Sequence, residues 1–183
     1  MTREKAVSII INDIIEKMTN ESRYEVLLDW WGIDQEDTVF NELSDVLQYE
    51  LVQLDEPPDY VMDDKYNPLI FRALKYKYLG VKNEYLSKRV CEILGTEHDI
   101  EGIQEELSIC PCCEYKSLLS NGEYDICPVC FWEDDGTINP EEYSSPNHMT
   151  LDEGRKHFTE FGAMSLSSLE FIKHDRLEKY SKS

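Results

Sequence analysis

The chain has 183 residues, of which 41% are hydrophobic and 11% aromatic, so it is long and apolar enough to bury a globular core. Its 38 acidic and 18 basic residues give a formal net charge of −20. This charge argues against a protein that binds duplex DNA or anionic membranes by neutralising phosphates, and it favours a basic protein partner. No apolar run approaches the roughly 18 residues of a membrane-spanning helix.

The first hundred residues predict a helical domain, residues 1–100. Apolar residues recur at helical spacing over about residues 3–18. Ser22 and Glu25 form a capping-box pattern before a second helix, for which Gly32 is the expected end. Asp34 is the expected cap of a third helix, which would run as one element to the residues before Pro57.

Two further helices are predicted in this half. Asn67 as N-cap and Pro68 at the first helical position predict a fourth helix that ends at Leu79 and Gly80. A fifth helix is expected over residues 83–94, closed by Gly95. Cys91 lies among the apolar residues of this helix, where a free cysteine is expected to pack as a small core residue.

Acidic residues are unevenly placed along the chain. Residues 34–64 hold eleven Asp and Glu and no Lys or Arg, whereas residues 65–89 hold seven basic residues and only one acid. The basic stretch could therefore pair internally with the acidic one, and the acidic runs could equally be solvated helix faces. Residues 55–67 form an irregular, proline-bearing stretch with aromatic and carboxylate side chains, which is typical of contact surfaces.

Two Cys-Pro-x-Cys units, Cys110 to Cys113 and Cys127 to Cys130, lie thirteen residues apart. Cysteines two residues apart can hold one ion from a tight turn, and two such turns supply four sulfurs at about 2.3 Å from a tetrahedral Zn²⁺. We therefore predict one structural Zn²⁺ bound by Cys110, Cys113, Cys127 and Cys130. Matching the two units leaves Cys112 as a free thiol that is expected to point outward.

Two alternatives to zinc are open. Iron in a rubredoxin-like site also uses two such turns, although the intervening loop is short for it. Disulfides are the other alternative, but the chain begins without the basic and apolar regions of a secretory signal, so we expect a cytoplasmic protein in which paired cysteines bind metal or do redox chemistry. A site with four sulfur ligands has no open position, so it would hold the fold and not catalyse.

The segment between the two cysteine pairs predicts a hairpin. Residues 115–119 and 124–126 resemble short strands, and Asn121-Gly122 between them favours a type I′ turn. After the cysteines, Thr150 and Glu153 predict a capping box for a helix that ends at Gly162, and a last helix is expected over residues 166–180. The second domain would cover residues 106–183. The fold class is therefore α+β and mostly α, with a helical bundle followed by a zinc-ribbon hairpin and flanking helices.

No catalytic motif is found. The four histidines are scattered and lie in neither an HExxH nor a serine-nucleophile motif, so we do not expect an enzyme. His148 is expected to be structural, and replacement of a cysteine ligand by it is a remote alternative. Residues 133–136 (Glu-Asp-Asp-Gly) lack the alternating spacing of an EF-hand loop and are a weak metal signal.

The motifs around the cysteines resemble the bacterial cysteine-rich CPCC family. The resemblance covers about residues 108–164 and rests on Cys-Pro-Cys-Cys-Glu-Tyr-Lys at 110–116, Gly-Glu-Tyr-Asp-Ile-Cys-Pro-Val-Cys-Phe-Trp-Glu-Asp-Asp-Gly at 122–136, Ser-Pro-Asn-His-Met-Thr-Leu-Asp-Glu-Gly-Arg at 145–155, and Phe-Gly-Ala at 161–163. Glu114 stands where this family usually has glycine, so the first turn is expected to be strained there. Some members of the family lie beside polymorphic toxins as suspected immunity proteins.

Three functional classes follow from these observations. The first is an immunity protein that covers the active cleft of a basic, nuclease-type toxin with an acidic surface. Its predicted partner-binding residues are Asp55, Glu56, Asp59, Tyr60, Asp63 and Asp64, with Trp132, Glu133, Asp134 and Asp135 as a second patch. The second class is a zinc-ribbon regulatory or nucleic-acid-binding protein that uses the basic residues of 65–89. The third is a redox or electron-transfer protein built on iron or on Cys112.

Overall fold

The computed structural model describes all residues from 1 to 183 and divides them into two compact units. The helical unit consists of Met1–Tyr78 and Leu86–Gly102, and the cysteine-rich unit consists of Leu79–Tyr85 and Ile103–Ser183. The predicted class, α+β and mostly α, is confirmed, because helices dominate and all strands are short. No helix is both long and apolar enough to cross a membrane.

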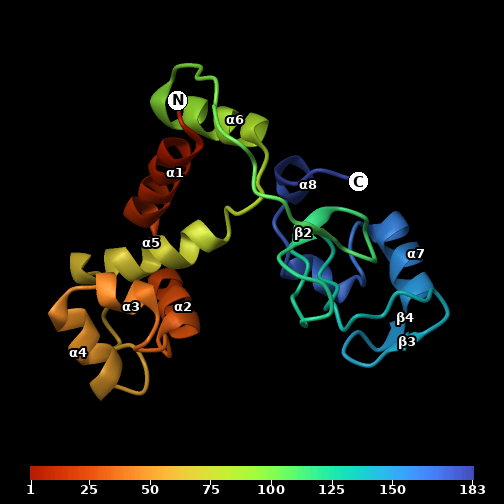
Figure 1. The fold of residues 1–183 in the computed structure, drawn as a ribbon, viewed down its shortest axis with the longest axis horizontal. Coiled ribbons are helices and arrows are strands. Elements are labelled where there is room, and N and C mark those ends of the chain that lie inside the picture. Colours follow the sequence, from red (N-terminus) through yellow and green to blue (C-terminus); the bar gives the residue numbers. More distant parts are fainter. The chain divides into compact units, whose positions relative to one another are not determined.

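The helical unit is built from six helices (Figure 1). They are α1 (Arg3–Lys17), α2 (Asn20–Trp30), α3 (Thr38–Glu42), α4 (Asp45–Gln53), α5 (Asn67–Tyr76) and α6 (Asn83–Leu94), of which α6 begins in the segment Leu79–Tyr85. A short 3-10 turn, η1 (Asp64–Tyr66), precedes α5. α5 contacts both α1 and α2, and their apolar faces form the core. Its fully buried members are Ala6, Ile10, Ile11, Leu27, Leu47, Val61, Tyr66, Leu69, Ile70, Ala73, Leu86 and Val90.

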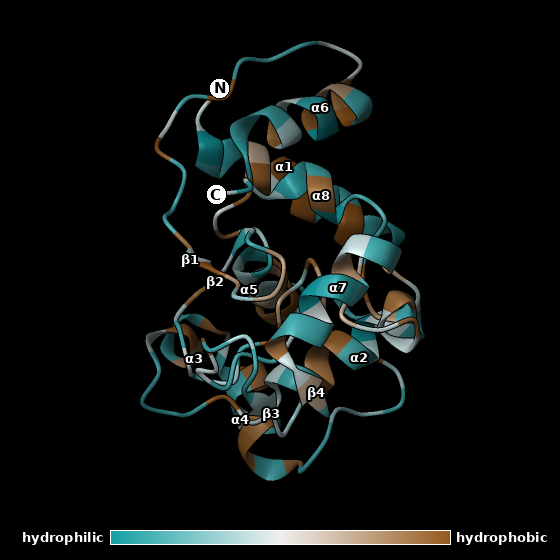
Figure 2. Cartoon of the chain, turned by 90° about the vertical axis from the view of Figure 1, so that its right-hand side faces the viewer, coloured by the Kyte–Doolittle hydropathy of each residue, from teal (hydrophilic) through white to brown (hydrophobic).

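The first and fifth predicted helices are confirmed. α1 begins after Thr2, whose hydroxyl accepts a hydrogen bond from the Lys5 amide. α6 ends at Gly95, which adopts a left-handed φ of +72° and donates its amide to the Cys91 carbonyl at 2.8 Å. Brown and teal residues alternate along α6 in Figure 2, as expected for a helix with one apolar face. Cys91 itself is only half-buried.

The caps of the second and fourth helices were predicted wrongly. Thr19, not Ser22, caps α2, because its hydroxyl accepts the Ser22 amide. Asn67 lies inside α5 and does not cap it; its side-chain oxygen instead accepts a hydrogen bond from Arg23 at 2.6 Å. Tyr66 takes the cap position without a side-chain hydrogen bond.

The predicted third helix is in fact two helices. The break falls at Leu43, which has an extended backbone, and Ser44 then caps α4 through the Leu47 amide. Asp37, not Asp34, caps α3. A serine side chain can hydrogen-bond a free amide of a new helix, so it favours a restart over continuation. As a result Leu43 and Leu47 are buried, whereas Val46 and Leu54 are exposed.

The cysteine-rich unit contains two small antiparallel sheets. β1 (Ser108–Ile109) pairs with β2 (Lys116–Leu118), and β3 (Tyr143–Ser144) pairs with β4 (Met149–Thr150). α7 (Leu151–Phe161) follows β4 directly. Its predicted capping box is present, and Gly162 ends it in the left-handed conformation.

Two predictions for this unit are wrong. Residues 116–118 do not pair with residues 124–126; each segment pairs across its own cysteine turn, with Ile109↔Lys116 around the first and Ile126↔Glu133 around the second. The single last helix is replaced by a 3-10 turn, η2 (Ser167–Glu170), and a short α8 (Arg176–Lys179). The apolar residues of 166–180 do not all pack on one side, since Leu166 and Phe171 are exposed while Ile172 and Tyr180 are buried.

Candidate metal centre

The two Cys-Pro-x-Cys units fold into the same turn. In the first, the Glu114 amide donates to the Cys110 carbonyl at 3.0 Å and the Cys110 amide donates to the Tyr115 carbonyl at 2.9 Å. In the second, the Phe131 amide donates to the Cys127 carbonyl and the Cys127 amide to the Trp132 carbonyl, both at 2.8 Å. Equal spacing in the sequence thus gives equal backbone geometry, and each turn presents its two sulfurs to one point.

Both turns require a left-handed residue directly after the second cysteine. Glu114 has φ +63° and Phe131 has φ +69°. The strain expected at Glu114 is therefore present in its backbone, and Phe131 shares it at the equivalent position. A side chain in this region typically costs about 1 kcal/mol, and that cost must be offset by the surrounding contacts.

The four predicted ligands lie together in the interior. The Sγ atoms of Cys110, Cys113, Cys127 and Cys130 all lie within 4.8 Å of one another, and all four residues are buried. The Cys110 and Cys130 sulfurs are 3.6 Å apart, and the Cys113 and Cys127 sulfurs are 3.7 Å apart. These separations exclude disulfides, in which the sulfurs are about 2.05 Å apart. A tetrahedron with sulfurs about 2.3 Å from its centre has edges of about 3.8 Å, so the residues fit a metal ion.

Electrostatics also favour a cation at this position. Burial raises the pKa of the Cys127 thiol, but hydrogen bonds from the other three thiols and from Ser117 outweigh it, so this pKa lies well below its ordinary value. The hydrogen bond with Cys113 raises the pKa of Cys110, and burial raises that of Cys130. Four thiolates held together in the interior would require a neutralising cation.

Cys112 does not point outward as predicted. It is only 3% exposed and lies under α7, where its sulfur is 3.4 Å from the position that a Cβ on Gly154 would take. Val129, at the equivalent position of the second turn, is fully buried as well. The x positions therefore form part of the core of this unit, and Cys112 stands outside the group of four ligands.

Two arginines from the following helices fix the turns. Arg155 of α7 donates its Nε to the Pro111 carbonyl at 2.9 Å. Arg176 of α8 donates its Nε to the Val129 carbonyl at 2.9 Å and an Nη to the Gly162 carbonyl at 3.0 Å. Neither arginine was predicted to have this role, because an isolated arginine gives no local sequence signal for a carbonyl partner far along the chain.

The second predicted partner patch is wrong for two of its residues. Trp132 is fully buried and packs against Gly154, and Asp134 is 2% exposed. The Asp134 carboxylate accepts the Gly122 amide at 2.8 Å, so it holds a loop instead of facing a partner. Asp135 accepts the Ser144 hydroxyl at 2.8 Å, and Glu133 donates its backbone amide to the Asn147 side chain.

The first predicted patch lies open to solvent. We define the acidic loop as residues 55–64, in which Asp55, Glu56, Asp59, Tyr60, Asp63 and Asp64 are all exposed. Two polar residues of α2 fix its base. Asn20 bonds the Asp59 carbonyl and the Val61 amide, and the buried Arg23 donates to the carbonyls of Val61 and Asp63.

Two basic residues of 65–89 pair with the acidic segment 34–64, as the charge distribution suggested. Lys65 contacts Glu50 at 2.5 Å and Arg72 contacts Glu42, whereas Arg89 contacts Glu92 in its own helix. These cations are therefore engaged by carboxylates of the helical unit.

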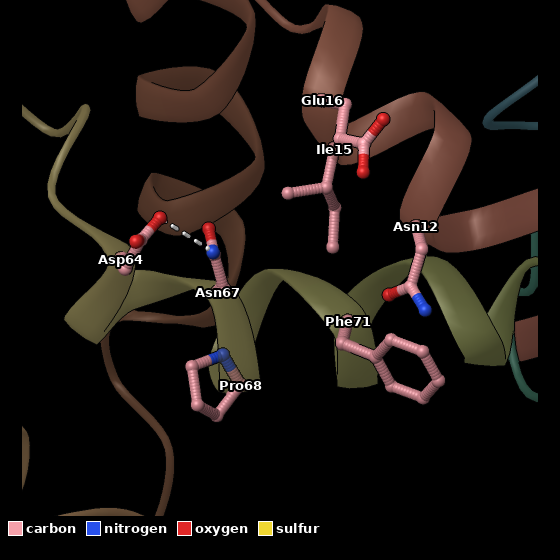
Figure 3. A pocket seen from close by; sticks show the side chains of 7 residues that line it. All are labelled: Asn12, Ile15, Glu16, Asp64, Asn67, Pro68 and Phe71. Carbon is pink, nitrogen blue, oxygen red and sulfur yellow. Dashed lines mark hydrogen bonds between the residues drawn. The ribbon is translucent and has the colours of Figure 1, made fainter.

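One concave site lies in the helical unit between α1 and the start of α5, with a volume of about 420 Å³ (Figure 3). Its lining residues are Asn12, Ile15, Glu16, Asp64, Asn67, Pro68 and Phe71. They include two carboxylates, one of them from the acidic loop, and no cysteine or histidine. Asp64 is held there by a 3.0 Å hydrogen bond from the side-chain Nδ2 of Asn67 to its carboxylate.

The histidines do not complete the metal centre. His148 is exposed in the turn between β3 and β4, with φ +55°, and is not among the four clustered residues. His157 bonds the Met164 carbonyl through its Nδ1 at 2.8 Å.

Two matching cysteine turns, four converging sulfurs and a helix packed across them define a small domain with a candidate metal site. Comparison with known families agrees with this geometry, since residues 108–178 match the cysteine-rich CPCC family. The C-terminal region of the chain is thus a cysteine-rich CPCC region. No curated protein and no solved structure matches the chain.

Proposed function

We propose that the CPCC region holds one structural Zn²⁺ through Cys110, Cys113, Cys127 and Cys130. The convergence of the four sulfurs carries this proposal. Four thiolates in two tight turns suit Zn²⁺, and such a site leaves no position for water or substrate. Its role is to hold the two turns together, and the protein is proposed to be non-catalytic.

Metal analysis tests the zinc proposal. Protein purified without added metal is expected to carry one zinc per chain by mass spectrometry of the metals and to be colourless. An iron tetrathiolate would instead be red in its oxidised form. Absence of any stoichiometric metal from freshly purified, fully reduced protein would overturn the proposal.

We further propose that the protein is an acidic binding protein, an immunity protein that neutralises a basic, nuclease-type toxin by covering its cleft. The supporting observation is the acidic loop, whose carboxylates are exposed above a base fixed by Asn20 and Arg23. Carboxylates on such a loop can occupy the positions that nucleic-acid phosphates take in the cleft, and the charge accelerates the encounter.

Charge reversal tests the binding proposal. Asp63 caps η1 and Asp64 bonds Asn67, so the clean variant changes only Asp55, Glu56 and Asp59 to lysine. The gene next to that of this chain is read first, and where it encodes a toxin, the catalytic domain of that toxin is the probe. We expect this variant to lose inhibition of the nuclease. A matched control reverses three exposed acids of the cysteine-rich unit, Glu123, Glu141 and Glu142, with the same change in net charge. Equal inhibition by both variants would refute the acidic loop as the binding surface.

A further inference from the structure

α4 and the loop that follows it expose several large apolar side chains. The exposed fractions are 59% for Val46, 68% for Tyr49, 48% for Val52, 43% for Leu54, 71% for Tyr60 and 39% for Met62. Brown segments along α4 in Figure 2 mark its hydrophobic residues. Single exposed apolar residues are ordinary, but six within seventeen positions of one chain segment need an explanation.

Folding of the helical unit does not require these side chains. α4 is attached through Leu47, which is fully buried, and through Glu50, which contacts Lys65 and accepts the Tyr66 hydroxyl at 3.0 Å. Val46, Tyr49 and Val52 follow one another at three-residue spacing, so they form a row on the helix surface. This row is left uncovered within the unit.

Exposed carboxylates occur in the same chain segment as this apolar set. The segment 34–64 holds eleven Asp and Glu and no Lys or Arg. Glu42 and Glu50 are engaged by Arg72 and Lys65, which leaves acids such as Asp45, Asp55, Glu56 and Asp59 exposed close in sequence to the apolar residues. An apolar, aromatic centre with a charged rim is the composition of a protein interface.

We propose that Val46, Tyr49, Val52 and Tyr60 form the centre of a docking surface for a cationic protein. The apolar residues contact an uncharged patch on the partner, and its Lys and Arg side chains meet the acidic rim. This inference rests on the proposed function. It goes further by naming the helical unit as the half of the chain that binds the partner and by naming the side chains that contact it. A second copy of this chain is a poor occupant, because two such acidic rims would repel each other.

Paired tyrosine variants test the docking surface. The variant Tyr49→Ala/Tyr60→Ala removes the two most exposed rings, and Tyr124→Ala/Tyr143→Ala removes two rings that are 61% and 60% exposed in the cysteine-rich unit. The full-length chains are titrated against the same toxin catalytic domain that tests the proposed function. We expect the first variant to weaken binding at least about 30-fold, as at interface hot spots, and the second to change it less than about threefold. Val46→Ser, which adds no charge, is expected to weaken binding as well.

The outcomes separate the two proposals. If the unmodified chain does not bind the toxin domain, the proposed function fails and the docking surface fails with it. If it binds and the Tyr49/Tyr60 variant binds equally well, only the docking surface is wrong. A dimer in sedimentation experiments that this variant abolishes would assign the surface to a second copy and overturn the inference. Circular dichroism of each variant checks that the fold is intact.

Discussion

Replacing one ligand of the metal centre should unfold the cysteine-rich unit and leave the helical unit folded. In Cys127→Ser, three sulfurs and a weakly binding hydroxyl remain. Structural Zn²⁺ sites contribute about 10–16 kcal/mol, so each of four sulfurs supplies about 2.5–4 kcal/mol if they share equally. That loss weakens metal binding by about two to three orders of magnitude.

The cysteine-rich unit has too little other stabilising structure to stay folded after this loss of metal-binding free energy. Its four strands are two or three residues long, and its two sheets have only two strands each, which is marginal for stability in water. A whole domain is stable by only about 5–15 kcal/mol, comparable to the contribution of the ion. The helical unit has its own core and does not share the ligands.

Hydrogen exchange with metal analysis measures this effect. In Cys127→Ser, or after chelation, amides of α7 are expected to lose protection while those of α1 and α5 keep it. Cys112→Ser and Cys91→Ser are the controls, because neither residue belongs to the cluster, and both should retain one metal per chain. Persistent protection of α7 in metal-free protein, or metal loss in Cys112→Ser equal to that in Cys127→Ser, would refute this reasoning.

Three further predictions address packing, capping and pH. Gly154→Ala should destabilise the metal-loaded protein by about 1–3 kcal/mol in thermal unfolding, because the new Cβ would lie 2.7 Å from a Trp132 ring carbon. Gly32→Ala is the control and should be tolerated, because no atom lies within 4 Å of its new Cβ. Thr150→Ala should cost about 1 kcal/mol and Thr150→Ser much less, measured by denaturant unfolding, because the hydroxyl accepts the Glu153 amide. The hydrogen bond with Glu50 raises the pKa of Lys65, so its stabilisation is complete below the unfolded-state pKa of about 10.4 and is lost as pH rises through the folded-state pKa. Lys65→Gln should therefore destabilise the helical unit by up to about 1 kcal/mol at pH 8, and this difference should shrink in strong base; a constant difference would contradict the assignment.

Structural features that depend on a few neighbouring residues were predicted correctly from the sequence. The helices 3–17, 83–94 and 151–161 follow from apolar spacing with a cap or a terminal glycine, and the structure has all three. The spacing of the cysteines also predicted the cluster of four sulfurs, because each Cys-Pro-x-Cys turn is local and its two sulfurs must point the same way. The predictions were wrong where two neighbouring residues offered equivalent capping signals. Thr19 caps α2 in place of Ser22, and Ser44 starts a new helix where one continuous helix was predicted.

Features that depend on distant contacts could not be predicted from the sequence. Trp132 and Asp134 look like surface residues, because they lie in an acidic, glycine-bearing stretch. Trp132 is buried because Gly154, more than twenty residues later, lets its ring approach α7, and Asp134 is buried because a carboxylate is needed at the Gly122 amide. Burial of a polar residue is tolerated when its hydrogen bonds are made, and those partners are invisible to a local pattern.

Distant contacts also prevent the hairpin that was predicted around Asn121-Gly122. A hairpin between residues 115–119 and 124–126 would need the amide of Lys116 and the backbone of 124–126 for pairing. The Lys116 amide instead bonds the Ser181 carbonyl, and the Tyr124 amide bonds the Asp134 carbonyl at 2.9 Å. Each cysteine turn uses its own flanking residues for a bridge, which places both turns in identical geometry and brings their four sulfurs together. The requirement of four converging sulfurs thus outweighs the turn preference of Asn121 and Gly122. The conformation of the loop between the two cysteine pairs is therefore determined by the geometry of the two turns.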